Sequence, residues 1–556
     1  MPRVVFLPAG QTVDVEAGAT ILEAARIAGV VIEAPCNGSG TCGKCKVRLE
    51  EASLGHVELY GRHKLSEDET RRGYVLACQS RIHGDVAVTI EGMTGSDGLK
   101  IVSDGVSRSF EIGPAISKRF SGAESLTYVT ADGDVIGTES GDTTGDQFGV
   151  VVDIGTTTLV ASLVDLRTGT ELGSASSLNP QATHAQDVLS RIKFASSAEG
   201  LDFMYSELTA EVNAMLSQIA TAANVDPSSI YEVVYSGNTC MLHLATATDP
   251  TSLGKSPYEP ALYGGSCISA RDLGLKVSDF GRVYLPPIIA AYVGADITSG
   301  ILAAGLEKRS GNVLFVDIGT NGEVVLSKDG ALTSTSTAAG PAFEGMNITF
   351  GMRAAPGAIE GFEITDDGFN INTIGDAAPE GICGSGLFDI VGELAVHGVI
   401  GRTGRFARAD SASLPAFLRD RITHVNSKPV FKIANEVYIS QDDIRQVQLA
   451  KGAIRAGIEV LLAHSNLSSA DLDEVLIAGS FGYHLQEKSI LSIGLLPRKV
   501  EGRISFLGNT SKSGGTIFLL DRSSRDSLAD LTGTVSVVEL SKYEGFDRVF
   551  ASHLGF

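Results

Sequence analysis

One sequence element occurs twice in this chain, and that repeat constrains the fold more than any other feature. Residues 148–169 and 312–330 each begin with an apolar run, pass through Asp-Ile-Gly-Thr and enter a second strand-like run that ends in a turn. This order predicts two β-strands joined by a tight turn, with the aspartate at the end of the first strand. Because one such element recurs at a long interval, we predict two similar lobes that face each other.

Each copy of the element presents groups that suit a nucleotide phosphate. The turn offers backbone N–H groups and threonine hydroxyls, and the aspartate can hold Mg²⁺ through water. One such turn is weak support, because a capped turn after a core strand can look the same, whereas two copies are much stronger. The predicted catalytic carboxylates are Asp153, Asp317 and Glu323, and the predicted phosphate-binding residues are Gly155, Thr156, Thr157, Gly319, Thr320, Asn321 and Gly322.

Further glycine turns are predicted to line the same site. Residues 473–482 read as a strand and a glycine turn that lets the backbone approach a nucleoside, although plain strand–turn–helix punctuation would give the same pattern. Before it, residues 446–462 carry an apolar face with helical period, and Lys451 on this helix either reaches a phosphate or is solvated. With the turns at 339–345 and 381–386, the predicted cofactor-binding residues also include Gly340, Gly384, Ser385, Gly479, Ser480 and Gly482.

Together these elements resemble the ATP-binding core shared by acetate and sugar kinases, heat-shock chaperones and actin. The resemblance covers residues 148–556 and implies two RNase H-like lobes, about 148–310 and 311–556, with ATP in the cleft between them. It also implies that both Asp-Gly-Thr turns contact the phosphates and that residues 479–482 contact the nucleoside.

Four cysteines near the N-terminus form a second pattern. Cys36, Cys42 and Cys45 are spaced C-x5-C-x2-C, and Cys78 follows alone. Three thiolates on one glycine-rich loop and a fourth from a distant strand can surround a small iron–sulfur cluster. Zinc is the alternative, since tetrahedral four-cysteine sites are common, but zinc ribbons usually pair two short knuckles and the fourth cysteine here has no such neighbour. We therefore predict that these four residues ligate an iron–sulfur cluster that moves single electrons.

Residues 1–94 are predicted to form one small domain around these cysteines. Strands at 4–7 and 13–15 form a hairpin, and a capping box that begins at Thr20 opens a helix. With the later strands, this order resembles the β-grasp fold of plant-type 2Fe–2S ferredoxins, and the fourth ligand Cys78 is expected on a strand. The first cysteine gap departs from the plant type, with five residues in place of four.

Residues 95–147 are rich in Gly, Ser, Asp and Thr, and they are either a flexible linker or a small ordered domain. The overall fold class is therefore α+β and α/β multidomain. We expect a β-grasp ferredoxin domain, a short linker or small middle domain, and a two-lobed actin-type ATPase domain.

Composition excludes some partners. A net charge of −22 opposes binding to nucleic acid and to anionic membranes, so we expect neither. The three remaining cysteines, Cys240, Cys267 and Cys383, are scattered, which suits a reducing compartment. The first residues contain no apolar run of signal-peptide length, and the apolar stretch 285–306 is interrupted by two prolines and Asp296. We expect a cytoplasmic protein without a transmembrane helix.

An electron carrier joined to an ATP-driven core resembles one family closely, the ATP-dependent reductive activators of corrinoid-dependent methyltransferase systems. The resemblance implies that one electron passes from an upstream low-potential donor to the 2Fe–2S cluster and then to cobalt(II) of a partner corrinoid protein, giving cobalt(I). It implies ATP as the driving force and permits a homodimer. Residues 95–147 are shorter than the middle domain expected of this family. The motifs that carry the resemblance lie at 236–250, 256–260, 292–296 and 381–389.

Three other functions stay open at this point. An activator of 2-hydroxyacyl-CoA dehydratases would carry a 4Fe–4S cluster on cysteines of the ATPase domain, where the three scattered cysteines are available. A small-molecule kinase with an attached redox domain would need a general base, for which Asp296 or Glu323 could serve. A chaperone-like module would need a peptide-binding domain, for which little chain follows Gly482.

Overall fold

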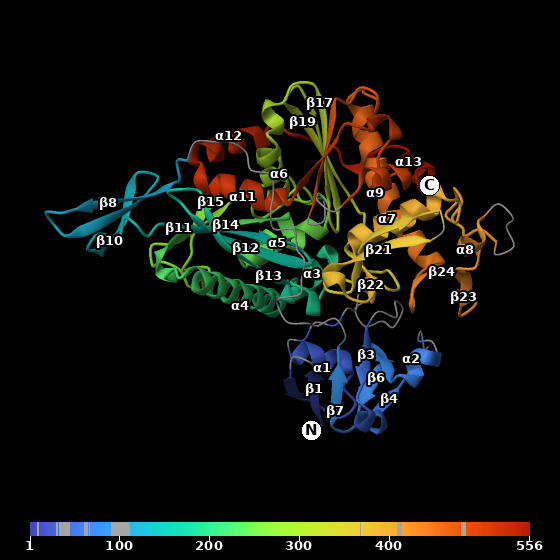
Figure 1. The fold of residues 1–556 in the computed structure, drawn as a ribbon. Helices are drawn as coiled ribbons and strands as arrows, with labels where there is room; N and C mark the ends of the chain where they lie inside the picture. Colours follow the sequence, from blue (N-terminus) through green and yellow to red (C-terminus); the bar gives the residue numbers. More distant parts are fainter. Residues whose placement is uncertain are drawn as a thin grey trace.

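A computed structural model describes residues 1–7, 10–28, 30, 32, 45–60, 65, 67–90, 112–366, 368–408, 414–479 and 485–556. Four predicted site residues lie outside this part of the chain: Cys36, Cys42, Ser480 and Gly482. Figure 1 shows an N-terminal domain beneath a two-lobed body, with a small sheet that projects to one side.

The N-terminal domain is a five-stranded sheet of order β2-β1-β7-β3-β5 with a helix across it. The predicted hairpin is present, since β1 and β2 are antiparallel with Val4 opposite Val13. The capping box is also present, because the Thr20 N–H donates to Glu23 Oε2 at 2.7 Å and the Glu23 N–H donates to Thr20 Oγ1 at 3.1 Å. The elements are β1 (Arg3–Leu7), β2 (Gln11–Asp14), α1 (Ile21–Ile27), β3 (Lys46–Leu49), β4 (Val57–Leu59), α2 (Glu67–Arg71), β5 (Tyr74–Leu76), β6 (Ser80–Ile82) and β7 (Val86–Thr89).

One detail of this domain differs from the prediction. Cys78 lies in a 3₁₀ turn, Ala77–Gln79, that follows β5, and is not on a strand. A turn breaks the strand's alternation of sides, which lets Cys78 reach the same place as Cys45 at the start of β3.

Residues 112–147 contain a three-stranded antiparallel sheet, β8 (Ile116–Ser121), β9 (Leu126–Ala131) and β10 (Asp134–Ser140). Charged contacts fix it to the first lobe. Lys118 Nζ lies 2.8 Å from Glu139 and donates to the Tyr231 hydroxyl at 2.8 Å, while Asp132 pairs with Arg282 and Arg522 at 2.5 Å each. This part of the chain is therefore ordered against the lobe, which favours the second of the two sequence interpretations.

The two copies of the repeat form the centres of two six-stranded sheets. Their orders are β13-β12-β11-β14-β16-β15 and β27-β26-β17-β18-β19-β28. In both sheets the first repeat strand pairs antiparallel with the second and parallel with a strand from much later in the chain. The strands are β11 (Phe148–Ile154), β12 (Thr158–Asp165), β13 (Glu171–Leu178), β14 (Ile230–Gly237), β15 (Ser266–Ser269), β16 (Arg282–Leu285), β17 (Asn312–Ile318), β18 (Gly322–Lys328), β19 (Ala331–Thr337), β26 (Glu474–Ala478), β27 (Ile504–Gly508) and β28 (Ser536–Val537).

Helices cover both sides of these sheets. On β11, Val150 and Val152 pack with α4 and α5, whereas Val151 faces a core that includes α6 and α11. Helix α11 packs on α6, β11 and β14, although it comes from the last tenth of the chain. The helices are α3 (Val188–Phe194), α4 (Ala198–Ala223), α5 (Thr239–Ala245), α6 (Ala295–Ala304), α7 (Gly384–Val396), α8 (Ala416–Arg419), α9 (Gln441–His464), α10 (Glu487–Ser492), α11 (Thr510–Leu520), α12 (Arg522–Thr532) and α13 (Phe546–Ser552).

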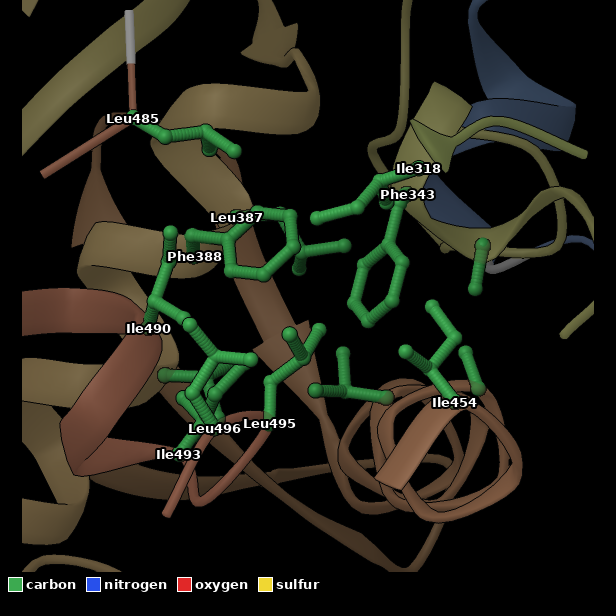
Figure 2. Packing of buried hydrophobic residues seen from close by; sticks show 14 of the residues in the cluster. Ile318, Phe343, Leu387, Phe388, Ile454, Leu485, Ile490, Ile493, Leu495 and Leu496 are labelled. Carbon is green, nitrogen blue, oxygen red and sulfur yellow. The ribbon is translucent and has the colours of Figure 1, made fainter. Parts of the chain in front are cut away.

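The second lobe has an apolar core that holds the short 3₁₀ helix Pro341–Glu344 beside the cleft. In this core Phe343 stacks on Phe388 with ring centroids 4.4 Å apart, and Figure 2 shows Ile318 and Ile454 beside them. Small sheets complete the lobe: β20 (Ala358–Ile364), β21 (Phe369–Thr373) and β22 (Gly381–Ile382), then β23 (Ile422–Val425), β24 (Lys428–Ala434) and β25 (Val437–Ser440). Among the described helices, none combines the length and apolarity that a bilayer crossing requires.

Candidate functional site

One cavity between the lobes gathers most of the residues predicted to bind a nucleotide. Both Asp-Gly-Thr turns open into it, together with the N-terminal turn of α7 and the end of β26. The predicted residues that line it are Asp153, Gly155, Thr156, Thr157, Asp317, Gly319, Thr320, Asn321, Glu323, Gly384, Ser385 and Gly479.

The two turns differ in their backbone hydrogen bonding and in their steric demands. The Gly155 N–H donates to the Thr158 carbonyl at 3.0 Å, and the Gly319 N–H donates to the Asn321 carbonyl at 3.0 Å. A Cβ on Gly155 would lie 2.5 Å from the Thr158 oxygen, whereas a Cβ on Gly319 would have its nearest neighbour at 3.7 Å. Only the first turn therefore requires glycine for space.

Two predicted residues lie outside the cavity lining. Gly322 sits beneath α9, where a Cβ would clash with Ile454, and its carbonyl accepts a hydrogen bond from Thr337. Gly340, with φ of 77°, precedes the short 3₁₀ helix Pro341–Glu344. The first glycine lets a helix approach a strand, and the second lets the chain turn, so each has a structural reason to be glycine.

Four of the carboxylates that line the cavity have raised pKa values, and of these Glu323 is buried and the other three are half-buried. Burial raises the pKa of Asp317 to about 8 and that of Asp296 to about 7, with neighbouring carboxylates adding to both shifts. Burial, followed by repulsion from Asp296 and Asp317, also raises the pKa of Glu323 well above its usual value. The pKa of Asp153 is raised by burial too, although hydrogen bonds from Ser511 and Asn509 oppose the rise.

The sequence prediction missed two asparagines that hold the first turn. Asn238 Nδ2 donates to Thr156 Oγ1 at 3.0 Å, and Asn509 Nδ2 donates to Asp153 Oδ2 at 2.7 Å. Each caps a helix, α5 or α11, and each stands in a Gly-Asn-Thr triplet directly after a strand. This repeated triplet, at 237–239 and 508–510, is the sequence pattern that could have indicated both asparagines.

No sequence pattern indicates the other residues that line the cavity. Ser511 donates to Asp153 Oδ1 at 2.7 Å, and Glu344 accepts hydrogen bonds from Thr157 and Thr320 at 2.6 Å each. Arg353 also lines the cavity. Their positions depend on tertiary packing, which no local pattern reports.

Among the described residues, the lining carries six acidic side chains and a single basic one, Arg353. A phosphate chain would be repelled there unless a divalent cation accompanied it. Within the described ranges, no three His, Cys, Asp or Glu side chains converge closely enough to hold a metal ion among themselves. This arrangement suits Mg²⁺, which usually keeps several waters and takes one or two carboxylates together with phosphate oxygens.

The two described cysteines of the N-terminal pattern lie together. Their Sγ atoms are 3.2 Å apart, and the Cys78 N–H points at Cys45 Sγ at 3.4 Å. Two thiolates on one tetrahedral metal ion lie roughly 3.8 Å apart, as a metal–sulfur bond of about 2.3 Å requires. The pair is buried, with 1% and 5% exposure, so its geometry and environment fit a shared iron of a 2Fe–2S cluster.

Among the described residues, a hydrogen bond and a charge interaction link this domain to the body. Gln186, just before α3, donates to the Ile32 carbonyl at 3.5 Å. On the other side, burial and the charge of Glu69 on α2 raise the pKa of Tyr438 on β25 to about 12. Glu69 also pairs with Lys46, the residue after Cys45, at 2.5 Å. The charge of Glu69, which pairs with the neighbour of Cys45, therefore acts on Tyr438 of the second lobe.

Comparisons with known proteins agree along the whole chain. A family model of the 2Fe-2S iron-sulfur cluster binding domain matches residues 5–83, a model of the RACo middle region matches 148–309, and a model of the C-terminal domain of RACo, the ASKHA domain, matches 311–556. A solved structure described as a reductive activator for corrinoid, iron-sulfur protein is 30% identical, with a TM-score of 0.73 over 100% of this chain and 98% of that chain. The chain belongs to the RACo family of corrinoid reductive activators.

Curated relatives extend this result. The corrinoid activation enzyme RamQ of Eubacterium limosum is 29% identical over 94% of this chain and 93% of that protein. The Co(II) methylated amine-specific corrinoid protein reductase of Methanosarcina barkeri is 24% identical over 74% of this chain and 77% of that protein. The RACo middle region is the first lobe itself. The assignment of residues 95–147 as a linker or a small middle domain stays a prediction.

Proposed function

We propose that this protein reductively activates a corrinoid protein by passing one electron from a 2Fe–2S cluster to cobalt(II), with ATP as the driving force. The observation that carries the proposal is the presence, in one RACo-family chain, of a cluster-type sulfur pair and a two-lobed nucleotide cavity. Neither part alone would account for an uphill electron transfer.

Cys36, Cys42, Cys45 and Cys78 would hold the cluster. A 2Fe–2S cluster there would supply single electrons at a potential of about −400 mV. The Cys78 N–H points at the Cys45 sulfur, and a hydrogen bond of that kind stabilises negative charge on a thiolate. A low-potential donor upstream would load the electron.

The cavity residues would hold ATP with Mg²⁺. Thr156, Thr157, Thr320 and the backbone of both turns would contact the phosphates. Gly479, which lines the same cavity, would let the backbone approach the nucleoside. Asp317, with Asp153, would orient the cation and the attacking water. Glu323 lies in the same acidic group as Asp317, which supports a role for its carboxylate in holding a proton or a water.

ATP hydrolysis would supply the free energy that the reduction of cobalt requires. The reduction of cobalt(II) to cobalt(I) requires a lower potential than the reduction of a plant-type cluster. A conformational coupling of about 1–3 kcal/mol shifts a one-electron equilibrium by only about 40–130 mV. A larger gap needs repeated ATP cycles or altered cobalt ligation in the complex.

The activator of 2-hydroxyacyl-CoA dehydratases is a less favoured function. Its cluster would need cysteines of the ATPase domain. Here Cys240 is buried in the core beside α4, where burial raises the pKa of its thiol to about 12. Cys383 is also buried, and its thiol donates to the Ile359 carbonyl at 3.2 Å. Both therefore behave as small core residues.

The proposal is tested with anaerobically reconstituted full-length protein, an oxidised corrinoid protein, a reductant and ATP. We expect a cobalt(I) absorption band that appears only with ATP and that disappears in Cys78→Ser, which removes a cluster ligand. Cys267→Ser is the matched control, because it removes a thiol from β15, far along the chain from the sulfur pair. A cobalt(I) band of equal size without ATP, or in Cys78→Ser, would contradict the proposal.

A further inference from the structure

The carboxylate of Glu344 connects the two lobes across the cavity. Thr157 of the first turn donates its hydroxyl to Oε2 at 2.6 Å, and Thr320 of the second turn donates its hydroxyl to Oε1 at 2.6 Å. Both lengths fall in the range of charge-assisted O–H···O⁻ hydrogen bonds. One side chain therefore accepts from both predicted phosphate-binding turns.

The backbone of Glu344 is fixed in the second lobe. It ends the 3₁₀ helix Pro341–Glu344, which lies between Gly340 and Gly345 with φ of 77° and 78°. The preceding residue, Phe343, is fully buried and stacks on Phe388 (Figure 2). The backbone of Glu344 stays in the second lobe, and its side chain reaches across the cleft. Rotation of that side chain is therefore enough to break the hydrogen bonds to both threonines.

The two threonine hydroxyls cannot serve this carboxylate and a phosphate together. Each hydroxyl has a single proton to donate, and both carboxylate and phosphate oxygens act as acceptors. Their negative charges also repel each other at short range. A phosphate bound by Thr157 and Thr320 must therefore take the place that the Glu344 carboxylate occupies.

We propose that Glu344 is a positioning residue that holds the place of an outer nucleotide phosphate and is displaced when that phosphate binds. Its carboxylate keeps the two turns at the spacing of a bridging anion in the nucleotide-free protein. The inference rests on the proposed nucleotide function and adds a competitor built into the site. Nucleotide affinity is consequently lower than the turns alone would give.

Calorimetric titration of the full-length protein with Mg-ATP and with AMP tests this displacement. In Glu344→Gln the competing charge is absent, so we expect ATP to bind about tenfold more tightly. AMP has no outer phosphates, and its affinity should change less than twofold. Weaker ATP binding in Glu344→Gln would overturn the proposal, because Glu344 would then contact the nucleotide or its cation directly.

Two further variants separate displacement from general charge removal. Glu344→Asp keeps the charge but is one methylene too short to accept from both threonines, so it should also bind ATP more tightly. Glu360→Gln removes one charge from the same cavity lining and should give a smaller gain. Equal gains in Glu360→Gln and Glu344→Gln, or an unchanged affinity in Glu344→Asp, would overturn the displacement. A wild-type protein that binds neither nucleotide would instead overturn the proposed function.

Discussion

The two Asp-Gly-Thr turns share a sequence but not an environment. The carboxylate of Asp153 accepts hydrogen bonds from Asn509 and Ser511, each at 2.7 Å. Among the residues that the structure describes, none donates a side-chain hydrogen bond to Asp317, and burial raises the pKa of Asp317 to about 8. The sequence repeat supplies two equivalent carboxylates, of which the fold restrains one. We infer that Asp153 positions the site and that Asp317 is the more reactive group.

The source of the restraint explains the asymmetry. Asn509 and Ser511 belong to the start of α11, which packs on β11 and on α6 between the two sheets. Asn509 also accepts a hydrogen bond from the Lys512 N–H at 2.9 Å, so the helix cap and the aspartate are tied together. The first turn is therefore coupled to a helix that directly follows β27 of the second sheet and packs on β11 and β14 of the first.

Among variants that test the difference between Asp153 and Asp317, Asp317→Asn is expected to have the largest effect on activity. ATP hydrolysis should fall by roughly 10²–10⁴-fold, as expected when a general acid or base is removed. The thermal midpoint should hold or rise, because a buried carboxylate without a side-chain donor is replaced by a neutral group. Steady-state phosphate release and thermal unfolding measure the two quantities.

Asp153→Asn is the matched variant for this test. It should lose about 1 kcal/mol of stability, because two charge-assisted hydrogen bonds become neutral ones. Equal stability losses in the two variants, or equal and small losses of hydrolysis, would remove the functional distinction between the turns.

A second contrast concerns the glycines of the two turns. Gly155→Ala should destabilise the first turn by about 1–3 kcal/mol and weaken Mg-ATP binding, because the added Cβ would lie 2.5 Å from the Thr158 oxygen. Gly319→Ala should change both quantities little, since its nearest neighbour would be at 3.7 Å. Thermal unfolding and ATP titration of the pair measure this difference. If Gly319→Ala proved the more damaging variant, the steric account of the turns would be wrong.

Local patterns were sufficient for much of the fold. Each apolar run followed by Asp-Ile-Gly-Thr became a strand and a turn, and the capping box at Thr20 opened α1 as predicted. Such features depend on residues close in sequence. The family resemblance then supplied the two-lobed arrangement, which the two six-stranded sheets centred on β11 and β17 confirm.

Features that depend on distant segments were beyond local patterns. Lys451 was predicted either to reach a phosphate or to be solvated, and both interpretations were wrong. It is 1% exposed, it donates to the Gly555 carbonyl, and its Nζ lies 5.3 Å from the Phe556 ring. Its partners lie about a hundred residues later in the chain, and only the packed lobe brings them to α9. Glu344 was missed for the same reason, since its partners Thr157 and Thr320 come from two different lobes.

A pH dependence of stability is also expected, and it belongs to the unrestrained carboxylate. Burial raises the pKa of Asp317 to about 8 and that of Asp296 to about 7, both from about 3.8. The nucleotide-free folded protein therefore holds protons that the unfolded chain has released, and stability declines as the pH rises from 5 to 8. Each such group contributes a slope of at most about 1.4 kcal/mol per pH unit.

Asp317→Asn isolates the share of Asp317 in this decline. The variant resembles the protonated side chain at every pH, so its thermal midpoint should gain on that of the wild type as the pH rises from 5 to 8. Thermal unfolding without nucleotide or Mg²⁺ across this range measures the gap. A gap that stays constant, or narrows toward pH 8, would show that Asp317 ionises at its ordinary pKa and that the two turns are electrostatically alike. A widening gap would instead place the difference between the turns in Asp317 itself, the carboxylate that α11 does not reach.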